Sequence, residues 1–266
     1  MAFGNGVLMR GPHYWAWARE DGTVMDRPVR TLLERHRCFR LPVIRSAVSF
    51  AEMIGLMVSM HARNGKWRAA RLLLWIALWL ATDLLLNIVL IHLLGAGMVE
   101  DAVLGVIDFG LFLLVLREGM GKEVWRYHGA EHKAVNAYEH GADLRDLRAV
   151  ATYSRVHNRC GTNLVIIMGA LMVLGYVAIV ALPAAGVLSS LFAVVALISA
   201  RELFRLVTRR PASAVSRVVL AGGKALQRCV TTREPGPEHL ELACAALNRV
   251  LDLEAQHPWG ETAGKS

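Results

Sequence analysis

The chain of 266 residues has only four cysteines, and none of them forms a C-x-x-C pair or a short regular spacing. That scarcity argues against a disulfide framework and a cysteine-rich zinc module, so we expect the thiols to be reduced. The chain is basic, with 30 Lys and Arg against 22 Asp and Glu, yet it lacks any zinc-finger, RNA-binding or helix-turn-helix pattern. We therefore expect no nucleic-acid partner and assign the positive charge to the surface of an anionic membrane.

Basic residues are also missing from three long apolar stretches, residues 72–99, 102–116 and 163–200. Hydrophobic residues make up 55% of the chain and concentrate in these stretches. A helix needs about 20 predominantly apolar residues to cross a bilayer. The sequence therefore predicts an integral membrane protein whose first partner is the lipid bilayer.

The basic residues predict how the chain crosses that bilayer. All of them lie in residues 1–71, 117–162 and 201–266, and the positive-inside rule places such segments in the cytoplasm. We predict an all-α integral membrane protein with about four transmembrane helices, in hairpins over residues 72–116 and 163–200. The protein is then multi-pass, and both termini are cytoplasmic.

Two cytoplasmic segments are predicted to be helical. Residues 46–62 carry Glu52 between basic flanks, which favours a helix in the membrane plane, although a crossing stays open. In the C-terminal segment, Pro237 suits a first helical turn, and Leu240 and Leu247 repeat at helical spacing. We expect an amphipathic helix there.

The central basic block contains an H-x-x-E-H pattern, formed by His128, Glu131 and His132. On a helix, positions i and i+4 lie on one face, so the two imidazoles can bind one divalent metal ion. We expect this ion to be zinc, with Glu131 on the same side as a general base. The competing interpretation is a helix with a solvated polar face.

Two more zinc-binding side chains, His157 and Cys160, lie three residues apart immediately before residue 163. Either or both can complete a tetrahedral site, and the sequence leaves that choice open. Glu139 lies on the same helical stripe as the H-x-x-E-H residues, so it is a further ligand, a partner of the ligands, or a solvated carboxylate.

Polar side chains also occur inside the predicted membrane hairpin, at Asp83, Asn87 and Asp108. Intramembrane carboxylates are costly, which favours a polar cavity or an ion path. An interhelical hydrogen bond that fixes the hairpin explains them equally well.

Four motifs carry a resemblance to a known family: VLMRGP (7–12), RYHGAEHKAVNAYEHG (126–141), RVHNRCGT (155–162) and LQRCVTTREP (226–235). With these motifs in this order, the chain resembles the YqhQ-like family of bacterial membrane proteins, which are described only as predicted metal-dependent enzymes. The resemblance implies a metal site and a bacterial cytoplasmic membrane, and it names no substrate. Beyond the residues above, it implicates Arg159, Thr231, Thr232, Glu234 and Pro235.

The chain departs from the family pattern at Asn5 and Asn158, where the family motifs have Glu and Pro. The first departure removes an acidic role at that position and leaves the H-x-x-E-H pattern untouched. The printed sequence begins within the opening motif, which leaves open a natural start upstream of Met1.

Our leading hypothesis is a membrane-anchored zinc-dependent hydrolase that acts on a lipid-like or anionic substrate at the cytoplasmic membrane face. Glu131 is the general base, and Arg126 or Arg159 holds an anionic group. The alternatives are a metal transporter or sensor that conducts through Asp83 and Asp108, and a membrane scaffold with a metal staple. An open coordination position would favour catalysis, and four protein ligands would favour the staple.

Overall fold

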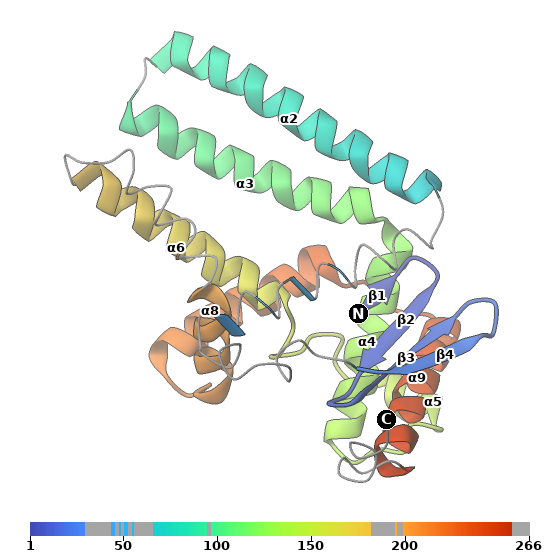
Figure 1. The fold of residues 1–266 in the computed structure, drawn as a ribbon. Helices are drawn as coiled ribbons and strands as arrows, with labels where there is room; N and C mark the ends of the chain where they lie inside the picture. The colour runs from blue at the N-terminus through green and yellow to red at the C-terminus, as the bar shows by residue number, and fades with distance from the viewer. Residues whose placement is uncertain are drawn as a thin grey trace.

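The computed structural model describes residues 1–29, 44–45, 48, 51–52, 55, 66–94, 97–181, 195 and 199–256. At one end of the molecule lie three long helices, α2 (Lys66–Leu94), α3 (Met98–Met120) and α6 (Thr162–Ala181) (Figure 1). At the other end, a small β-sheet packs with α4 (Lys122–Glu139), α5 (Leu147–Ala151) and α9 (Pro237–Gln256). The predominance of helix agrees with the sequence-based prediction.

The sheet corrects the prediction that the fold is all-α. It has four antiparallel strands in sequence order: β1 (Ala2–Phe3), β2 (Gly6–Arg10), β3 (Tyr14–Arg19) and β4 (Val24–Pro28). The strands form because Trp, Tyr, Val and Met alternate between two faces, and because Gly-Pro and Asp-Gly pairs provide the turns. The paired register, for example Val7 opposite Ala18, fixes which side chains face the helices.

One hydrophobic core joins the sheet to α4 and α9. The sheet contributes Val7, Met9, Ala16 and Ala18, and the two helices contribute residues at helical spacing, namely Tyr127, Ala130, Ala134, Ala137, Leu240, Ala243, Cys244, Leu247 and Val250. Alanines dominate the buried face of α4, so the neighbouring elements approach its backbone closely. The opposite face of the sheet buries a separate hydrophobic cluster of Phe3, Leu8 and Trp17. The core holds α4, and therefore the H-x-x-E-H pattern, in a fixed position.

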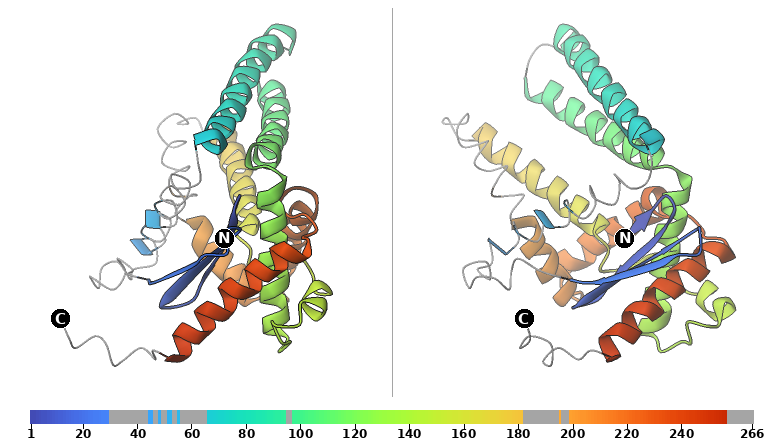
Figure 2. Two further views of the ribbon diagram at one scale, coloured as in Figure 1. Left: turned by 90° about the vertical axis from the view of Figure 1, so that its right-hand side faces the viewer. Right: turned by 45° about the vertical axis from the view of Figure 1, so that its right-hand side comes forward.

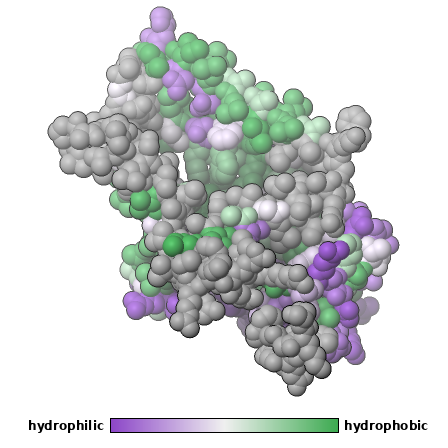
Figure 3. Space-filling view, viewed as in Figure 1, coloured by the Kyte–Doolittle hydropathy of each residue, from purple (hydrophilic) through white to green (hydrophobic). Residues whose placement is uncertain are grey.

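Helix α2 contains one segment long and apolar enough to cross a membrane, the 21 residues Leu73–Leu93. Its outer face exposes large apolar side chains such as Leu74, Leu85 and Leu93, which are 68%, 61% and 70% exposed. Figure 3 shows many hydrophobic residues over α2 and α3, with some hydrophilic residues among them, and more hydrophilic residues at the other end of the molecule. Helix α3 is longer than the predicted span of 102–116 and carries charged residues near both of its ends.

Helices α3 and α4 follow each other with a single residue between them. Gly121 has φ +85°, a conformation that favours glycine, and it separates α3 from α4. Helix α4 then ends at Glu139, close to Gly141. The short helix that follows is capped by Asp146, whose carboxylate accepts hydrogen bonds from two backbone N–H groups.

The second predicted hairpin, over residues 163–200, lies only partly within the described residues. Its first half is α6, and residues 199–209 form another helix. Helix α8 (Ala214–Leu226) packs against α6 and continues into the π-helical turn η3 (Gln227–Thr231) (Figure 2). Within the in-plane helix predicted over 46–62, residues 48, 51–52 and 55 are helical, and the remainder lies outside the described residues.

Candidate metal centre

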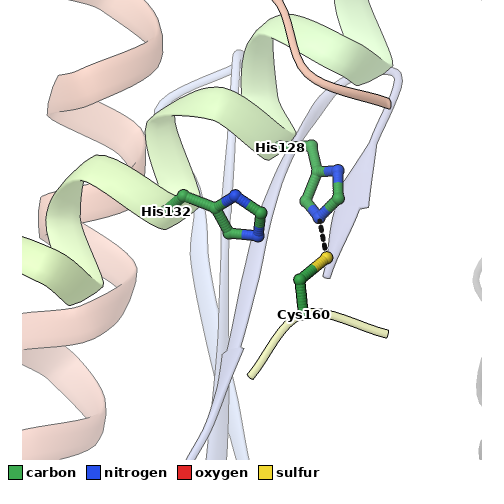
Figure 4. Close-up of side chains that lie close together, drawn as sticks. All are labelled: His128, His132 and Cys160. Carbon is green, nitrogen blue, oxygen red and sulfur yellow. Dashed lines mark hydrogen bonds between the residues drawn. The ribbon is translucent and has the colours of Figure 1, made fainter. Parts of the chain in front are cut away.

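Three side chains converge at the junction of the two ends of the molecule: His128 and His132 from α4, and Cys160 from the loop before α6 (Figure 4). One donor atom of each lies within 4.8 Å of the others. The two imidazole rings are one helical turn apart, with centroids separated by 4.3 Å. Among the described residues, this is the group of three donors whose spacing suits a metal ion.

Backbone carbonyl groups fix the orientation of both imidazoles. His128 Nδ1 lies 2.6 Å from the carbonyl oxygen of Thr231, and His132 Nδ1 lies 2.8 Å from that of Arg155. A carbonyl oxygen only accepts hydrogen bonds, so each Nδ1 carries a proton, and loss of the other ring proton would leave a lone pair on Nε2 that can bind a metal. Histidine ligands of metals are typically held in this way.

The Cys160 sulfur is held by hydrogen bonds as well. The Thr162 backbone N–H donates to Cys160 Sγ at 3.4 Å, and the Thr162 hydroxyl lies 3.2 Å from the same atom. That hydroxyl is also 3.1 Å from the hydroxyl of Thr231, so a buried pair of threonines links the sulfur to the segment that holds His128. Cys160 and both threonines are almost fully buried.

The electrostatics of the group favour a thiolate. Burial raises the pKa of Cys160, but the hydrogen bonds and positive charge offered by His128 and His132 outweigh it and lower the pKa to about 5. Burial by itself would lower the pKa of His128. The adjacent sulfur of Cys160 and the Glu131 carboxylate outweigh that effect, so the pKa of His128 is raised. Thiolate is the form of cysteine that binds metals.

Glu131 lies beside the two imidazoles, on the side of α4 that the helical spacing predicts. Its Oε1 forms an ion pair of 2.7 Å with the amino group of Met1, and Oε2 is buried without a hydrogen-bond partner among the described residues. Burial raises the pKa of this carboxyl, but the Met1 amino group and the imidazoles of His128 and His132 lower it further, so its pKa falls below the ordinary value. The carboxylate is therefore ionised near neutral pH.

His157 lies next to the group of three donors and outside it. Its ring centroid is 5.9 Å from that of His132. His157 Nε2 lies 3.3 Å from the Glu139 carboxylate, and Nδ1 accepts a hydrogen bond from the Arg159 backbone at 3.2 Å. Burial lowers the pKa of His157, and hydrogen bonding to Glu139 only partly offsets this effect. The structure thus brings Cys160, rather than His157, to the paired imidazoles, and it joins Glu139 and Arg159 in an ion pair beside His157.

The C-terminal TTREP motif lies against α4, far from it in sequence. Besides the Thr231 carbonyl, it provides Glu234, which forms an ion pair of 2.7 Å with the buried Lys133. Thr232 is turned away from the metal group, and its hydroxyl and N–H both donate to the Gln227 carbonyl. This close packing requires Gly129, because a Cβ atom there would collide with the carbonyl oxygen of Arg233.

Gln227 connects η3 to the loop before α6, and no sequence pattern singles it out. Its amide oxygen accepts from the His157 N–H at 2.9 Å and its amide nitrogen donates to the His157 carbonyl at 3.1 Å. Gln227 is fully buried and belongs to η3, whose last residue is Thr231. Single π-helical turns are common at functional sites, yet no local sequence pattern identifies this contact.

The remaining predicted residues lie away from the three donors. Arg126 is exposed and pairs with Glu123 one turn earlier. In the hairpin, the Trp79 indole N–H donates to the Asp108 carboxylate at 2.6 Å, which is an interhelical hydrogen bond between α2 and α3. Asp83 and Asn87 are half-buried on α2, one turn apart.

With this geometry established, the chain can be compared with known proteins. A family model described as "Protein of unknown function (DUF1385)" matches residues 41–253. The chain belongs to the DUF1385 family. This DUF1385 chain is also 30% identical over 139 residues to "Uncharacterized protein YqhQ" of Bacillus subtilis (strain 168). These matches confirm the resemblance drawn from the four motifs.

The match to the Bacillus protein covers 50% of this chain and 42% of that protein, so it spans less than half the relative's length. The DUF1385 region includes all three donors of the metal group and the TTREP motif. No solved structure matches the chain.

Proposed function

We propose that this protein is a membrane-anchored zinc-dependent enzyme whose centre is formed by His128, His132 and Cys160. The observation that carries the proposal is the convergence of three good zinc donors whose two imidazoles are already oriented by backbone carbonyl groups. A solvated polar helix face would not require such orientation.

The donors fit a zinc ion in kind and in spacing. Zinc binds thiolate sulfur at about 2.3 Å and imidazole nitrogen at about 2.0–2.1 Å in a tetrahedral arrangement. Those lengths and the tetrahedral angle place the two ligand atoms roughly 3.5 Å apart. The separation of Cys160 Sγ and His128 Nε2 is 3.4 Å.

Three protein donors favour catalysis over a structural staple, because catalytic zinc sites keep one position open while structural sites have four protein ligands. A bound zinc ion would act as a Lewis acid toward a substrate oxygen and would activate water. Glu131, ionised and beside both imidazoles, accepts the proton that hydrolysis releases. Exposed arginines such as Arg126 and Arg159 provide charge for an anionic substrate.

We further propose that the protein is a multi-pass protein of the bacterial cytoplasmic membrane with about four spans and cytoplasmic termini. The apolar segment Leu73–Leu93, the apolar helix α6 and the absence of basic residues from 163–200 support this arrangement. The metal centre then lies at the cytoplasmic face, which favours a lipid-like or anionic substrate of the inner leaflet. Reporter domains fused after residues 66, 140 and 260 should all report the cytoplasm, and a periplasmic signal at 140 would overturn the topology.

The enzyme proposal is tested by variants that remove a metal ligand and, separately, by a variant that removes the general base. His128→Ala, His132→Ala and Cys160→Ser should each strip zinc from the purified protein, measured by elemental analysis. His140→Ala, at the residue that follows α4, and Cys229→Ser, an exposed cysteine, are matched controls that should retain it.

Glu131→Gln should keep zinc and lose turnover. Lipid profiles of cells that produce this variant should show accumulation of a species that cells with the natural protein consume. Wild-type protein that never binds zinc would contradict the proposal, and a Glu131→Gln variant with normal lipid profiles would favour a metal staple.

A further inference from the structure

Helix α8 combines a buried face with an apolar face that is exposed. Its inner residue Leu220 packs with Ile167 of α6 and Val207 of the preceding helix. On the outer face, Val215 and Val218 are 70% and 73% exposed. Ala214, Ala221 and Ala225 are also exposed and share that face with Val218 at helical spacing. On the surface of a soluble protein such a face would be unusual, because a helix normally presents polar residues to water.

The charge around this face indicates what covers it. Residues 203–233 contain seven Arg or Lys and no Asp or Glu. Two of the cations, Arg217 and Lys224, lie two helical turns apart along one edge of the outer face of α8. A partner that complements this segment is therefore apolar in the middle and anionic at its edge. An anionic lipid surface has that chemistry, and clusters of four to eight basic residues next to a membrane typically bind it.

The position of α8 agrees with such a partner. It packs along the first half of α6, an apolar helix that exposes Val173 and Leu174 (Figure 2). At its other end α8 runs directly into η3, whose Thr231 carbonyl orients His128. The helix thus connects the apolar part of the molecule to the metal centre.

We propose that α8 lies in the plane of the membrane surface, with Val215 and Val218 among the acyl chains and Arg217 and Lys224 on lipid phosphates. The proposal rests on the membrane location given above and does not depend on the metal. Through η3, lipid contact at α8 would hold the Thr231 carbonyl in place at the site where an inner-leaflet substrate is bound.

The proposal can be tested with the full-length protein in lipid nanodiscs that carry either phosphatidylcholine alone or phosphatidylcholine with phosphatidylglycerol. p-Benzoylphenylalanine replaces Val218, and light-induced adducts are identified by mass spectrometry. Leu85 on the outer face of α2 is the positive control for membrane insertion. Tyr138, which is 49% exposed near the end of α4, is the negative control.

We expect phospholipid adducts at residues 218 and 85 and none at 138, with phosphatidylglycerol preferred at 218. One cation near an anionic surface contributes about fivefold to binding. Arg217→Gln with Lys224→Gln should therefore lower that preference at least about fivefold. Arg145→Gln with Arg148→Gln, at two exposed arginines just before and within α5, removes the same charge and should leave the preference unchanged.

Each other result overturns the proposal. Adducts at residue 218 with residues 30–65 of the same chain, or with a second copy, would show that protein covers α8. Lipid adducts at residue 85 without any at 218 would reject the α8 proposal and leave membrane insertion intact. Absence of lipid adducts at both positions would reject both.

Discussion

Replacing Gly129 with alanine tests whether close approach of the C-terminal motif to α4 builds the candidate metal centre. A Cβ atom at this position collides with the carbonyl oxygen of Arg233. That carbonyl cannot move alone, because the Arg233 N–H donates to the Trp125 carbonyl at 2.9 Å. The substitution must therefore displace the backbone that also presents the Thr231 carbonyl to His128.

The expected change in the free energy of unfolding combines two opposing effects. Alanine is favoured over glycine inside a helix by about 1 kcal/mol. Overpacking in a close-packed region costs about 1–3 kcal/mol. We therefore expect Gly129→Ala to lower the free energy of unfolding by about 1 kcal/mol. Loss of the Thr231–His128 hydrogen bond should also weaken zinc binding about 10- to 100-fold.

Gly222→Ala is the matched control, because Gly222 is also inside a helix and its Cβ would meet Ile166 only at an ordinary 3.6 Å. The free energy of unfolding of this variant should rise by about 0.5–1 kcal/mol, and the variant should bind zinc normally. The assays are thermal unfolding and zinc titration of both variants in the same nanodiscs. If Gly129→Ala were as stable as Gly222→Ala and bound zinc with unchanged affinity, the assignment of Gly129 to this close contact would be refuted.

Three further variants test other contacts. Gln227→Leu removes both hydrogen bonds to His157, so zinc affinity should fall about tenfold in titrations while α8 stays helical by circular dichroism. The pKa of Glu254 lies below its ordinary value of 4.5, because N–H groups that include that of His13 outweigh the effect of burial. Its stabilisation is therefore present above that value and is lost as the pH falls through the lowered pKa. Glu254→Gln should lower the free energy of unfolding by about 1–2 kcal/mol at neutral pH. It should also flatten the acid side of a plot of unfolding temperature against pH. Asp108→Leu breaks the hydrogen bond between α2 and α3, so it should lower the unfolding temperature without changing zinc uptake into vesicles, whereas an ion path would lose uptake.

The parts of the molecule that follow from local periodicity could be predicted from the sequence. His128 and His132 share a helix face because i and i+4 always do, and α4 forms where the H-x-x-E-H spacing predicts a helix. The amphipathic helix α9 begins at Pro237 and buries Leu240 and Leu247 as its pattern indicates.

The N-terminal sheet is the part of the fold that the sequence-based prediction lacks. Its strands are only two to six residues long, and the positive charge of residues 1–71, which predicts their side of the membrane, carries no information about strands. The Gly11-Pro12 and Asp21-Gly22 pairs between aromatic-rich runs were the available turn signals.

Contacts between distant segments could not be predicted from local patterns. Gln227 and His157 are 70 residues apart, and neither has a neighbour pattern that reports the other. The choice of Cys160 over His157 likewise depends on the path of the loop between α5 and α6, which no periodicity fixes.

The most direct test of the proposed metal centre is X-ray absorption spectroscopy at the zinc edge on the full-length protein. We expect one sulfur at about 2.3 Å and two imidazole nitrogens at about 2.0–2.1 Å, with a lighter atom in a fourth position. Cys160→Ser should remove the sulfur signal, and Cys229→Ser should leave it unchanged. A zinc spectrum without sulfur, or with four protein ligands, or a protein that takes up no zinc, would contradict the account.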